Sequence, residues 1–233
     1  MIRRTPLFLP LAAALMMGLS ACQNASAASE AQALPAPVVD ASSATGEQTA
    51  VFAGGCFWGI EAVFEHIKGV DKATAGYSGG QASTASYDQV STGETRHAES
   101  VKVQFNPKQV SYGTLLRVFF SVALDPTELN RQGPDSGTQY RSVIFYGNDE
   151  QQKVASAYIA QLTAANSFSA PIVTQVVPLK AFYAAEAYHQ HYFNEHPDNP
   201  YIVYNDAPKV AHLAQLFPSI YRDSQQVVDV QLR

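Results

Sequence analysis

The pattern of apolar residues after about residue 50 constrains the fold of this chain more than any other feature. Short apolar runs, which predict strands, alternate with segments whose apolar residues recur three and four positions apart, which predicts helices. The predicted strands are 50–53, 101–105, 143–146 and 172–177, and the predicted helices contain 60–67, 115–122, 151–162 and 184–195. This alternation predicts helices packed on one sheet. Residues 76–96 and 125–141 are polar and rich in Gly, Ser and Thr, so we expect long functional loops there.

Two details mark the helix ends. Gly69 follows the first predicted helix and stops it. Asn148 precedes the third, with Gln151 at the position of a capping box.

Composition narrows the class of protein. Hydrophobic residues are 46% of the 233 and charged ones 15%, which is enough apolar material for a core and excludes global disorder. The net charge is −5, with no basic run, so nucleic-acid binding is not expected. Apolar runs are shorter than the ~20 residues of a membrane-spanning helix. The 2 cysteines exclude a multi-disulfide scaffold and a Cys-rich zinc site.

The first 21 residues have the layout of a secretory signal. Arg3 and Arg4 precede an apolar segment from Leu7 to Leu19. Leu-Ser-Ala followed by Cys22 resembles the lipobox of bacterial lipoproteins, which implies cleavage after residue 21 and acylation of Cys22. Several acyl chains give stable anchoring. We therefore expect a protein held by lipid in the bacterial cell envelope, with its domain facing the periplasm or the exterior; an ordinary secretory signal is the alternative.

The next segment separates this signal from the domain. Residues 22–49 are rich in Ala, Ser, Pro and Gln and have no periodic apolar face, so we predict a flexible tether and a folded domain over 50–233. If Cys22 is acylated, Cys56 is the one free thiol left in the mature chain and an intramolecular disulfide is impossible.

Cys56 lies between the first predicted strand and the first predicted helix. Gly54 and Gly55 precede it and allow a tight turn, and Phe57 and Trp58 follow it. A cysteine at a helix N-terminus meets free backbone N–H groups that favour the thiolate and lower its pKa. Two aromatic side chains beside it suit a small apolar group such as a methyl. The residues alone leave two interpretations, a reactive thiol or a small buried hydrophobe.

A family resemblance decides between them. The Gly-Cys-Phe-Trp-Gly sequence at 55–59 resembles the signature of the class A peptide methionine sulfoxide reductases. Further motifs follow in the same order and extend the resemblance over residues 50–221. They are Gly76-Tyr77-Ser78-Gly79-Gly80, Tyr87, His97-Ala98-Glu99, Asp125-Pro126, Arg131-Gln132-Gly133, residues 135–142 and Ala185-Glu186-Ala187-Tyr188-His189-Gln190.

The resemblance implies a fold and a reaction. The fold is an α/β two-layer sandwich of ferredoxin-like character, with a mixed, largely antiparallel sheet against helices. The reaction is the reduction of methionine S-sulfoxide, free or in oxidised proteins, with Cys56 attacking sulfur and Glu99 protonating oxygen. Protonation makes oxygen a leaving group, and burial is what keeps a carboxyl protonated near neutral pH.

The resemblance also implies the supporting residues. Tyr87 and Tyr140 reach the sulfoxide oxygen, Asp135 orders the site, and Phe57 and Trp58 hold the substrate methyl. A C-terminal tyrosine also joins some sites of the family, for which Tyr201 and Tyr204 are equal candidates.

The chain departs from many relatives in having no cysteine after Cys56. The sulfenic acid left on Cys56 must then be reduced by an external thiol, for which we expect a thioredoxin-like donor. No cofactor or metal is expected: His189 and His191 are two residues apart and would point to different sides of a helix. We expect a monomer.

Two rival functions remain at this point. A one-cysteine peroxidase would use the same thiol but has no need of an acid such as Glu99. A non-catalytic surface lipoprotein that binds partners through its long loops needs neither residue. A Cys56→Ser variant separates these alternatives, because it abolishes either enzyme activity and leaves a binding function intact.

Overall fold

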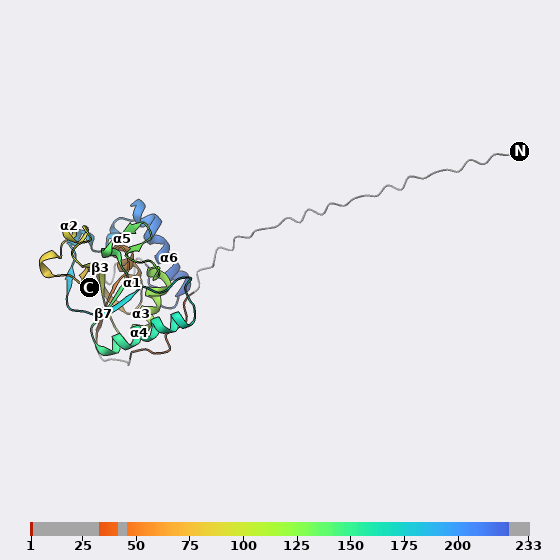
Figure 1. Cartoon of the computed structure of the whole chain (residues 1–233), viewed down its shortest axis with the longest axis horizontal. Helices are drawn as coiled ribbons and strands as arrows, with labels where there is room; N and C mark the ends of the chain where they lie inside the picture. The colour runs from red at the N-terminus through yellow and green to blue at the C-terminus, as the bar shows by residue number, and fades with distance from the viewer. Residues whose placement is uncertain (2–32, 42–45, 224–233) are drawn as a thin grey trace. The chain divides into compact units, whose positions relative to one another are not determined.

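The computed structural model describes Met1, residues 33–41 and residues 46–223 (Figure 1). The predicted signal peptide after Met1, the predicted acylation site Cys22 and tether residues 23–32 lie outside the described residues. Within the described part of the chain, no helix combines the length and the apolar character needed to cross a membrane.

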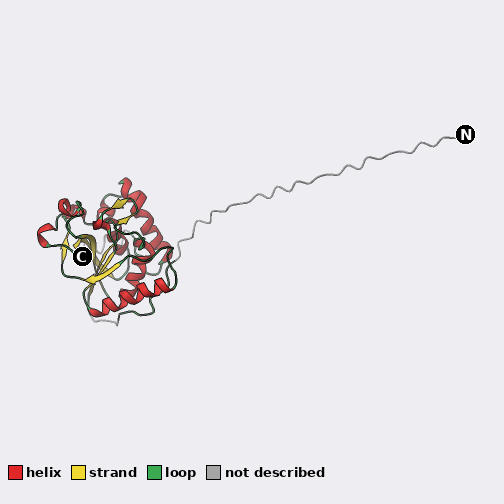
Figure 2. Cartoon of the chain, in the orientation of Figure 1, coloured by secondary structure: helices red, strands yellow, loops and turns green. Residues whose placement is uncertain are grey.

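Six strands of the described chain form one sheet in the order β7-β6-β1-β3-β2-β8. Neighbours are antiparallel except β6 and β7, which are parallel. Figure 2 shows this sheet inside the domain with helices around it. The strands are β1 (Gln48–Ala53), β2 (Val70–Ser78), β3 (Ala98–Phe105), β6 (Val143–Tyr146), β7 (Gln175–Pro178) and β8 (Phe182–Ala184). A separate hairpin pairs β4 (Arg131–Gln132) with β5 (Asp135–Ser136).

Helices connect these strands. The longer ones are α1 (Phe57–Glu65), α3 (Tyr112–Val118), α4 (Asp149–Ala164) and α6 (Ala207–Leu216). Single turns are α2 (Tyr87–Val90), α5 (Tyr192–Glu195), the 3₁₀ turns η1 (Ala82–Thr84), η3 (Thr138–Tyr140) and η4 (Ala187–His189), and the π-helical turns η2 (Phe119–Ala123) and η5 (Ile202–Asp206).

The chain order and the sheet order together define the fold. β1, α1, β2, β3, α3 and β6 follow one another as β-α-β-β-α-β, and their strands lie side by side as β6-β1-β3-β2. This is the ferredoxin-like arrangement. The implied fold, a largely antiparallel mixed sheet packed against helices, is confirmed. β7 extends the sheet beyond β6, and β8 extends it beyond β2.

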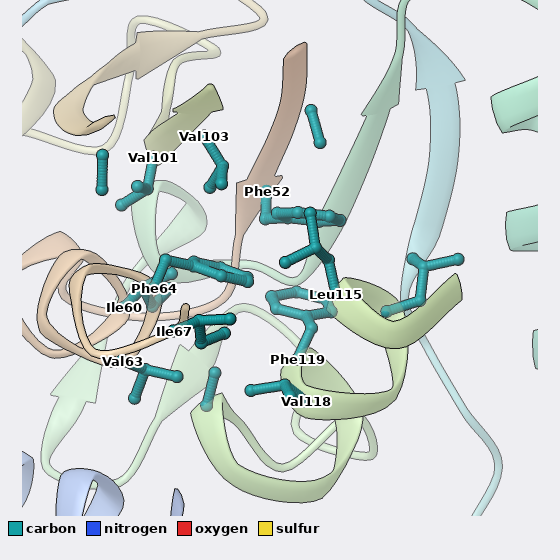
Figure 3. Close-up of a cluster of buried hydrophobic side chains, with 14 of the residues drawn as sticks. Phe52, Ile60, Val63, Phe64, Ile67, Val101, Val103, Leu115, Val118 and Phe119 are labelled. Atoms are coloured by element: carbon teal, nitrogen blue, oxygen red, sulfur yellow. The ribbon is translucent and has the colours of Figure 1, made fainter. Parts of the chain in front are cut away.

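Alternation along β1 builds a core on each face of the sheet. Phe52 points toward the helices, where its ring stacks on Phe64 of α1 at 5.1 Å and on Phe119 of η2 at 5.0 Å (Figure 3). Val51 and Ala53 point to the other face and pack in a smaller cluster with residues of β6. Because β1 is buried on both faces, the turn that follows it is firmly held.

Several sequence predictions are confirmed. Strands form at 50–53, 101–105 and 143–146. Helices α1 and α3 cover the first part of the predicted helical segments 60–67 and 115–122. The third predicted helix is α4, and the Asn148 side chain caps it by accepting a hydrogen bond from the Gln151 amide at 2.9 Å.

Two predictions are wrong. Strand β2 was not predicted; its last three residues fall in the expected loop 76–96, and a bulge between Val70 and Lys72 breaks its alternation. The helix expected over 184–195 is instead a strand end and two short turns. His191, whose φ of 55° is left-handed, separates those turns.

The tether prediction is also wrong for the part that the structure describes. Residues 33–41, here called the strap, lie against α3, η2 and α4. The Leu34 amide donates to Ser121 Oγ at 3.1 Å, and Tyr158 Oη donates to the Pro35 carbonyl at 2.9 Å. Asp40 Oδ1 accepts the Gly113 amide at 2.7 Å in the first turn of α3. These hydrogen bonds replace the backbone solvation that would otherwise keep such a polar segment free.

Candidate active site

Cys56 is the residue immediately before α1, and Gly54 and Gly55 separate it from the end of β1 at Ala53. Gly55 makes the turn with a φ of +104°, and a Cβ there would lie 2.7 Å from the Gln132 side chain. This position therefore requires glycine for two reasons: its positive φ and the lack of space for a side chain. The predicted place of Cys56, at the N-terminus of a helix, is confirmed.

The electrostatic effect predicted from that place is wrong. The pKa of Cys56 is raised well above its usual value, chiefly by burial and next by the charges of Glu99 and Asp206. The backbone N–H of Trp58 lowers it only in part. Desolvation, the largest cause, outweighs the helix terminus and favours the thiol form of Cys56.

Glu99 lies on β3 and is 2% exposed. Its Oε2 accepts a hydrogen bond from the Phe57 amide at 3.1 Å, which fixes the carboxyl beside the residue that follows Cys56. Burial raises the pKa of Glu99 to about 8, the Phe57 amide opposes this, and Asp135 adds to it. A protonated carboxyl thus adjoins the thiol at neutral pH.

Tyr87 and Tyr140 come from the two polar connections. Tyr87 begins α2, where its amide donates to Glu186 Oε1 at 2.9 Å, and Tyr140 ends η3. Burial, followed by the charge of Glu99, raises the pKa of both hydroxyls. Both therefore stay protonated and able to donate hydrogen bonds.

Phe57 and Trp58 are held by aromatic neighbours. Phe57 is buried against His189, with ring centroids 5.0 Å apart. The indole of Trp58 stacks on Tyr192 at 3.8 Å, and its Nε1 donates to His189 Nδ1 at 3.2 Å. The edge of Tyr201 meets the indole at 5.8 Å.

The structure distinguishes the two candidate tyrosines. Tyr201 contacts Trp58 and donates its hydroxyl to Asp135 Oδ2, whereas Tyr204 is 78% exposed. Tyr201 therefore joins the site and connects Asp135 to the aromatic group. The contacts of Tyr192 and His189 with Trp58 were not predicted, since more than 130 residues separate them in sequence and only the Tyr-His-Gln motif hinted at a role.

A cluster of titratable side chains forms where Glu61 and Glu65 of α1 approach His191. Glu61 accepts the amides of Ala75 and His191. Glu65 accepts from His191 Nδ1 and from Asn194 Nδ2. Hydrogen bonds from the protein thus reach all four carboxyl oxygens of Glu61 and Glu65, and they link α1 to β2 and to residues 191–194.

A cavity of about 300 Å³ opens onto Cys56. Its walls are residues 122–125 and 132–135, Glu128, Tyr201, Asn205 and Lys209. Glu99, Tyr87, Tyr140, Phe57 and Trp58 are not among them. Cys56 therefore has two different surroundings. One is the group of two buried and three partly buried side chains here called the acid side, Glu99, Phe57, Trp58, Tyr87 and Tyr140. The other is this cavity.

Together the fold and the site define a thiol enzyme in which a buried carboxylic acid adjoins the cysteine. The comparisons with known proteins identify its family. Residues 48–219 match the family model described as peptide methionine sulfoxide reductase, and the chain belongs to this family. It is accordingly an enzyme of thiol-dependent methionine sulfoxide reduction, as the sequence resemblance implied.

Relatives cover the domain closely. The chain is similar to peptide methionine sulfoxide reductase MsrA 2 of Mesorhizobium japonicum, with 55% identity over 82% of this chain and 97% of the relative. It is 49% identical to MsrA of Pasteurella multocida over 75% of this chain and 99% of the relative.

Solved structures agree on the fold. Reduced Mxr1 from Saccharomyces cerevisiae gives a TM-score of 0.58 at 35% identity, covering 66% of this chain and 87% of that one. Methionine sulfoxide reductase A of Corynebacterium diphtheriae gives 0.55 at 34%, covering 66% and 77%.

Proposed function

We propose that this enzyme reduces the S epimer of methionine sulfoxide, free or in oxidised proteins, by attack of Cys56 on the sulfoxide sulfur. Glu99 protonates the sulfoxide oxygen as the attack proceeds. As the sulfur–sulfur bond forms, the Cys56 thiol gives up its proton, which replaces the one that Glu99 donates. The bond then breaks as the protonated oxygen moves to Cys56, so that methionine leaves and Cys56 becomes a sulfenic acid. The electrons come from the cysteine sulfur, and the oxygen passes from methionine to Cys56.

The state of Glu99 is the observation that carries this proposal. A pKa of about 8 makes its carboxyl a proton donor at pH 7, and the Phe57 amide holds it next to Cys56. A general acid is most effective when its pKa lies near the working pH. A peroxidase depends less on such an acid, because the oxygen–oxygen bond of a peroxide is weaker than the sulfur–oxygen bond of a sulfoxide.

The remaining residues orient the substrate. Tyr87 and Tyr140, kept neutral by raised pKa values, donate hydrogen bonds to the oxygen without competing for its proton. Phe57 and Trp58 form the apolar wall for the methyl group. Asp135 acts through Tyr201. The Tyr201 hydroxyl donates a hydrogen bond to Asp135, and the Tyr201 ring contacts the ring of Trp58.

The catalytic cycle needs a reductant from outside the chain. Cys56 is the last cysteine of the sequence, so no resolving thiol follows it. We infer that an external thiol, from a thioredoxin-like donor, reduces the sulfenic acid. Full turnover with dithiothreitol but none with any thioredoxin-fold donor would contradict the thioredoxin-like choice.

The reaction is tested with the soluble domain, beginning at residue 33 so that the strap is kept. The domain is incubated with racemic methionine sulfoxide and dithiothreitol, and the epimers are separated by chromatography. We expect loss of the S epimer alone, and no loss with Cys56→Ser. Consumption of both epimers, or activity that survives in Cys56→Ser, would contradict the proposal.

We further propose that residues 1–21 are a lipoprotein signal peptide and that acylated Cys22 anchors the enzyme in the bacterial cell envelope. The lipobox-like sequence supports this. The full chain should incorporate labelled palmitate and fractionate with membranes, and Cys22→Ala should do neither. A soluble, unlabelled wild-type protein would contradict it.

A further inference from the structure

The cavity that opens onto Cys56 has a basic side chain in an otherwise acidic or uncharged wall. Asp125, Glu128 and Asp135 line it with acidic groups, and Lys209 is the single basic residue among the described residues that line it. Cys56 is also close to the charge of Asp206, which disfavours a thiolate. An anion that must reach Cys56 by this route would therefore be repelled everywhere except at Lys209.

Lys209 is held in place by a buried partner. Its Nζ lies 3.1 Å from Asp206 Oδ1, and the Asp206 side chain is fully buried. The other carboxylate oxygen, Asp206 Oδ2, is buried and has no hydrogen-bond partner among the described residues. A buried polar atom of this kind is rare in native proteins and calls for an explanation.

The pair packs directly on the helix that carries the active cysteine. A Cβ at Gly59, in the first turn of α1, would lie 2.1 Å from Asp206 Oδ1 and 2.9 Å from Lys209 Nζ. The missing side chain of Gly59 thus makes room for the pair three residues after Cys56.

η5 ends at Asp206 and α6 begins at Ala207, so the helical backbone is continuous through the pair. An Asp and a Lys three residues apart lie on one face of a helix, which holds Lys209 at the wall of the cavity.

We propose that the external thiol reaches Cys56 through this cavity, and that Lys209 is the cation that attracts and holds its attacking thiolate. This inference rests on the proposed function, because it concerns the sulfenic acid that the first step leaves on Cys56.

The chemistry is balanced with thiol as the reductant. A first thiol attacks the Cys56 sulfenic acid, a sulfur–sulfur bond forms, the sulfur–oxygen bond breaks, and water leaves. A second thiol then attacks the mixed disulfide, which returns the Cys56 thiol and releases an external disulfide. Two thiols are oxidised for each methionine sulfoxide reduced.

The lining of the cavity supports this route. It reaches Cys56 and is lined by Lys209, but by none of Glu99, Tyr87 and Tyr140.

The test separates the two halves of the cycle. The first half is measured as the methionine formed per enzyme without reductant. The second half is measured as the rate constant at which added 2-mercaptoethanol removes the sulfenic acid. The sulfenic acid that remains is trapped with dimedone and quantified by mass spectrometry. We expect Lys209→Met to slow the second half about tenfold or more, because the cation that concentrates the thiolate is gone. Raising the salt concentration should slow the wild type and not the variant. Lys153→Met, at an exposed position of α4, is the matched control and should leave both halves unchanged.

A double variant excludes a merely structural role. If Lys209 only neutralises Asp206, the Asp206→Asn/Lys209→Met variant should recover the wild-type rate of the second half. We expect that rate to stay low. Recovery in the double variant, or an unchanged second half in Lys209→Met, would overturn the inference. Absence of methionine in the first half of the wild type would instead contradict the proposed function.

Discussion

Two buried glutamates with raised pKa values lie close to the same helix and have different roles. Glu61 is on α1 and Glu99 is on the neighbouring β3, and burial is the largest cause of the shift in each. Both oxygens of Glu61 accept backbone amides, whereas Glu99 accepts one amide through Oε2 and adjoins Cys56. A raised pKa therefore marks burial, and only the contacts show which carboxyl has a chemical task.

The largest expected effect concerns the acid on the active side. Glu99→Gln keeps the shape and loses the proton, so we expect the single-turnover rate to fall by about 10²–10⁴. Rapid-quench measurement of methionine checks this. Glu61→Gln should leave the rate within about twofold, and an equal loss in the two variants would break the distinction between them.

The pH dependence of the free energy of unfolding should report the raised pKa of Glu99. Between the ordinary glutamate pKa of 4.5 and the raised value of about 8, Glu99 binds a proton in the folded state and has lost it in the unfolded state. The stabilisation is therefore complete below about pH 4.5 and is lost as the pH rises through about 8. Urea unfolding across this range should show falling stability, and Glu99→Gln should flatten the fall. A slope unchanged in Glu99→Gln would contradict the raised pKa.

Glu61 should matter for stability instead of rate. Its two oxygens accept the amides of Ala75 and His191, and Gln offers an NH₂ group in place of one acceptor. We expect Glu61→Gln to lower the free energy of unfolding by about 1–3 kcal/mol. Denaturant titration measures it, with Glu94→Gln at an exposed position as control.

The smallest expected effect is on thiol reactivity. The Glu99 charge raises the pKa of Cys56, but it is present only above about pH 8. Glu99→Gln should therefore speed alkylation by iodoacetamide a few-fold at pH 9 and leave it unchanged at pH 6.5, since at the lower pH both side chains are neutral. A faster reaction at both pH values would show that Glu99 is ionised in the resting enzyme.

Local patterns in the sequence predicted those elements that local forces determine. β1, α1 and α4 have clear apolar periodicity or a side-chain cap. β2 escaped prediction because Ala73, Ala75 and Gly76 provide little apolar contrast and the bulge shifts its register. No local sequence signal shows that residues 70–78 form the strand that pairs with β3.

The segment 184–195 failed for a different reason. Its side chains bond distant backbone instead of their own helix: Gln190 accepts the Ala75 amide and donates to the Ala75 carbonyl, both at 3.0 Å. Such long-range bonds override helix propensity and are invisible to periodicity.

The site was predicted through the family motifs, and its physics only in part. Cys56 was placed correctly, but its pKa moves in the opposite direction because burial and acids from other elements outweigh the helix terminus. Tyr201 was separated from Tyr204 only by its contacts with Asp135 and Trp58. Lys209 and Asp206 drew no attention in the sequence, since nothing local indicates that they pack on Gly59.

The most direct test of the account is a single turnover on separated epimers of methionine sulfoxide without any thiol. The account predicts one methionine per enzyme from the S epimer and none from the R epimer, with a rate constant that falls above about pH 8 as Glu99 ionises. Cys56 should then react with dimedone as a sulfenic acid. Methionine formed without a sulfenic acid on Cys56, or a rate constant that is flat through pH 8, would contradict the pairing of Cys56 with Glu99.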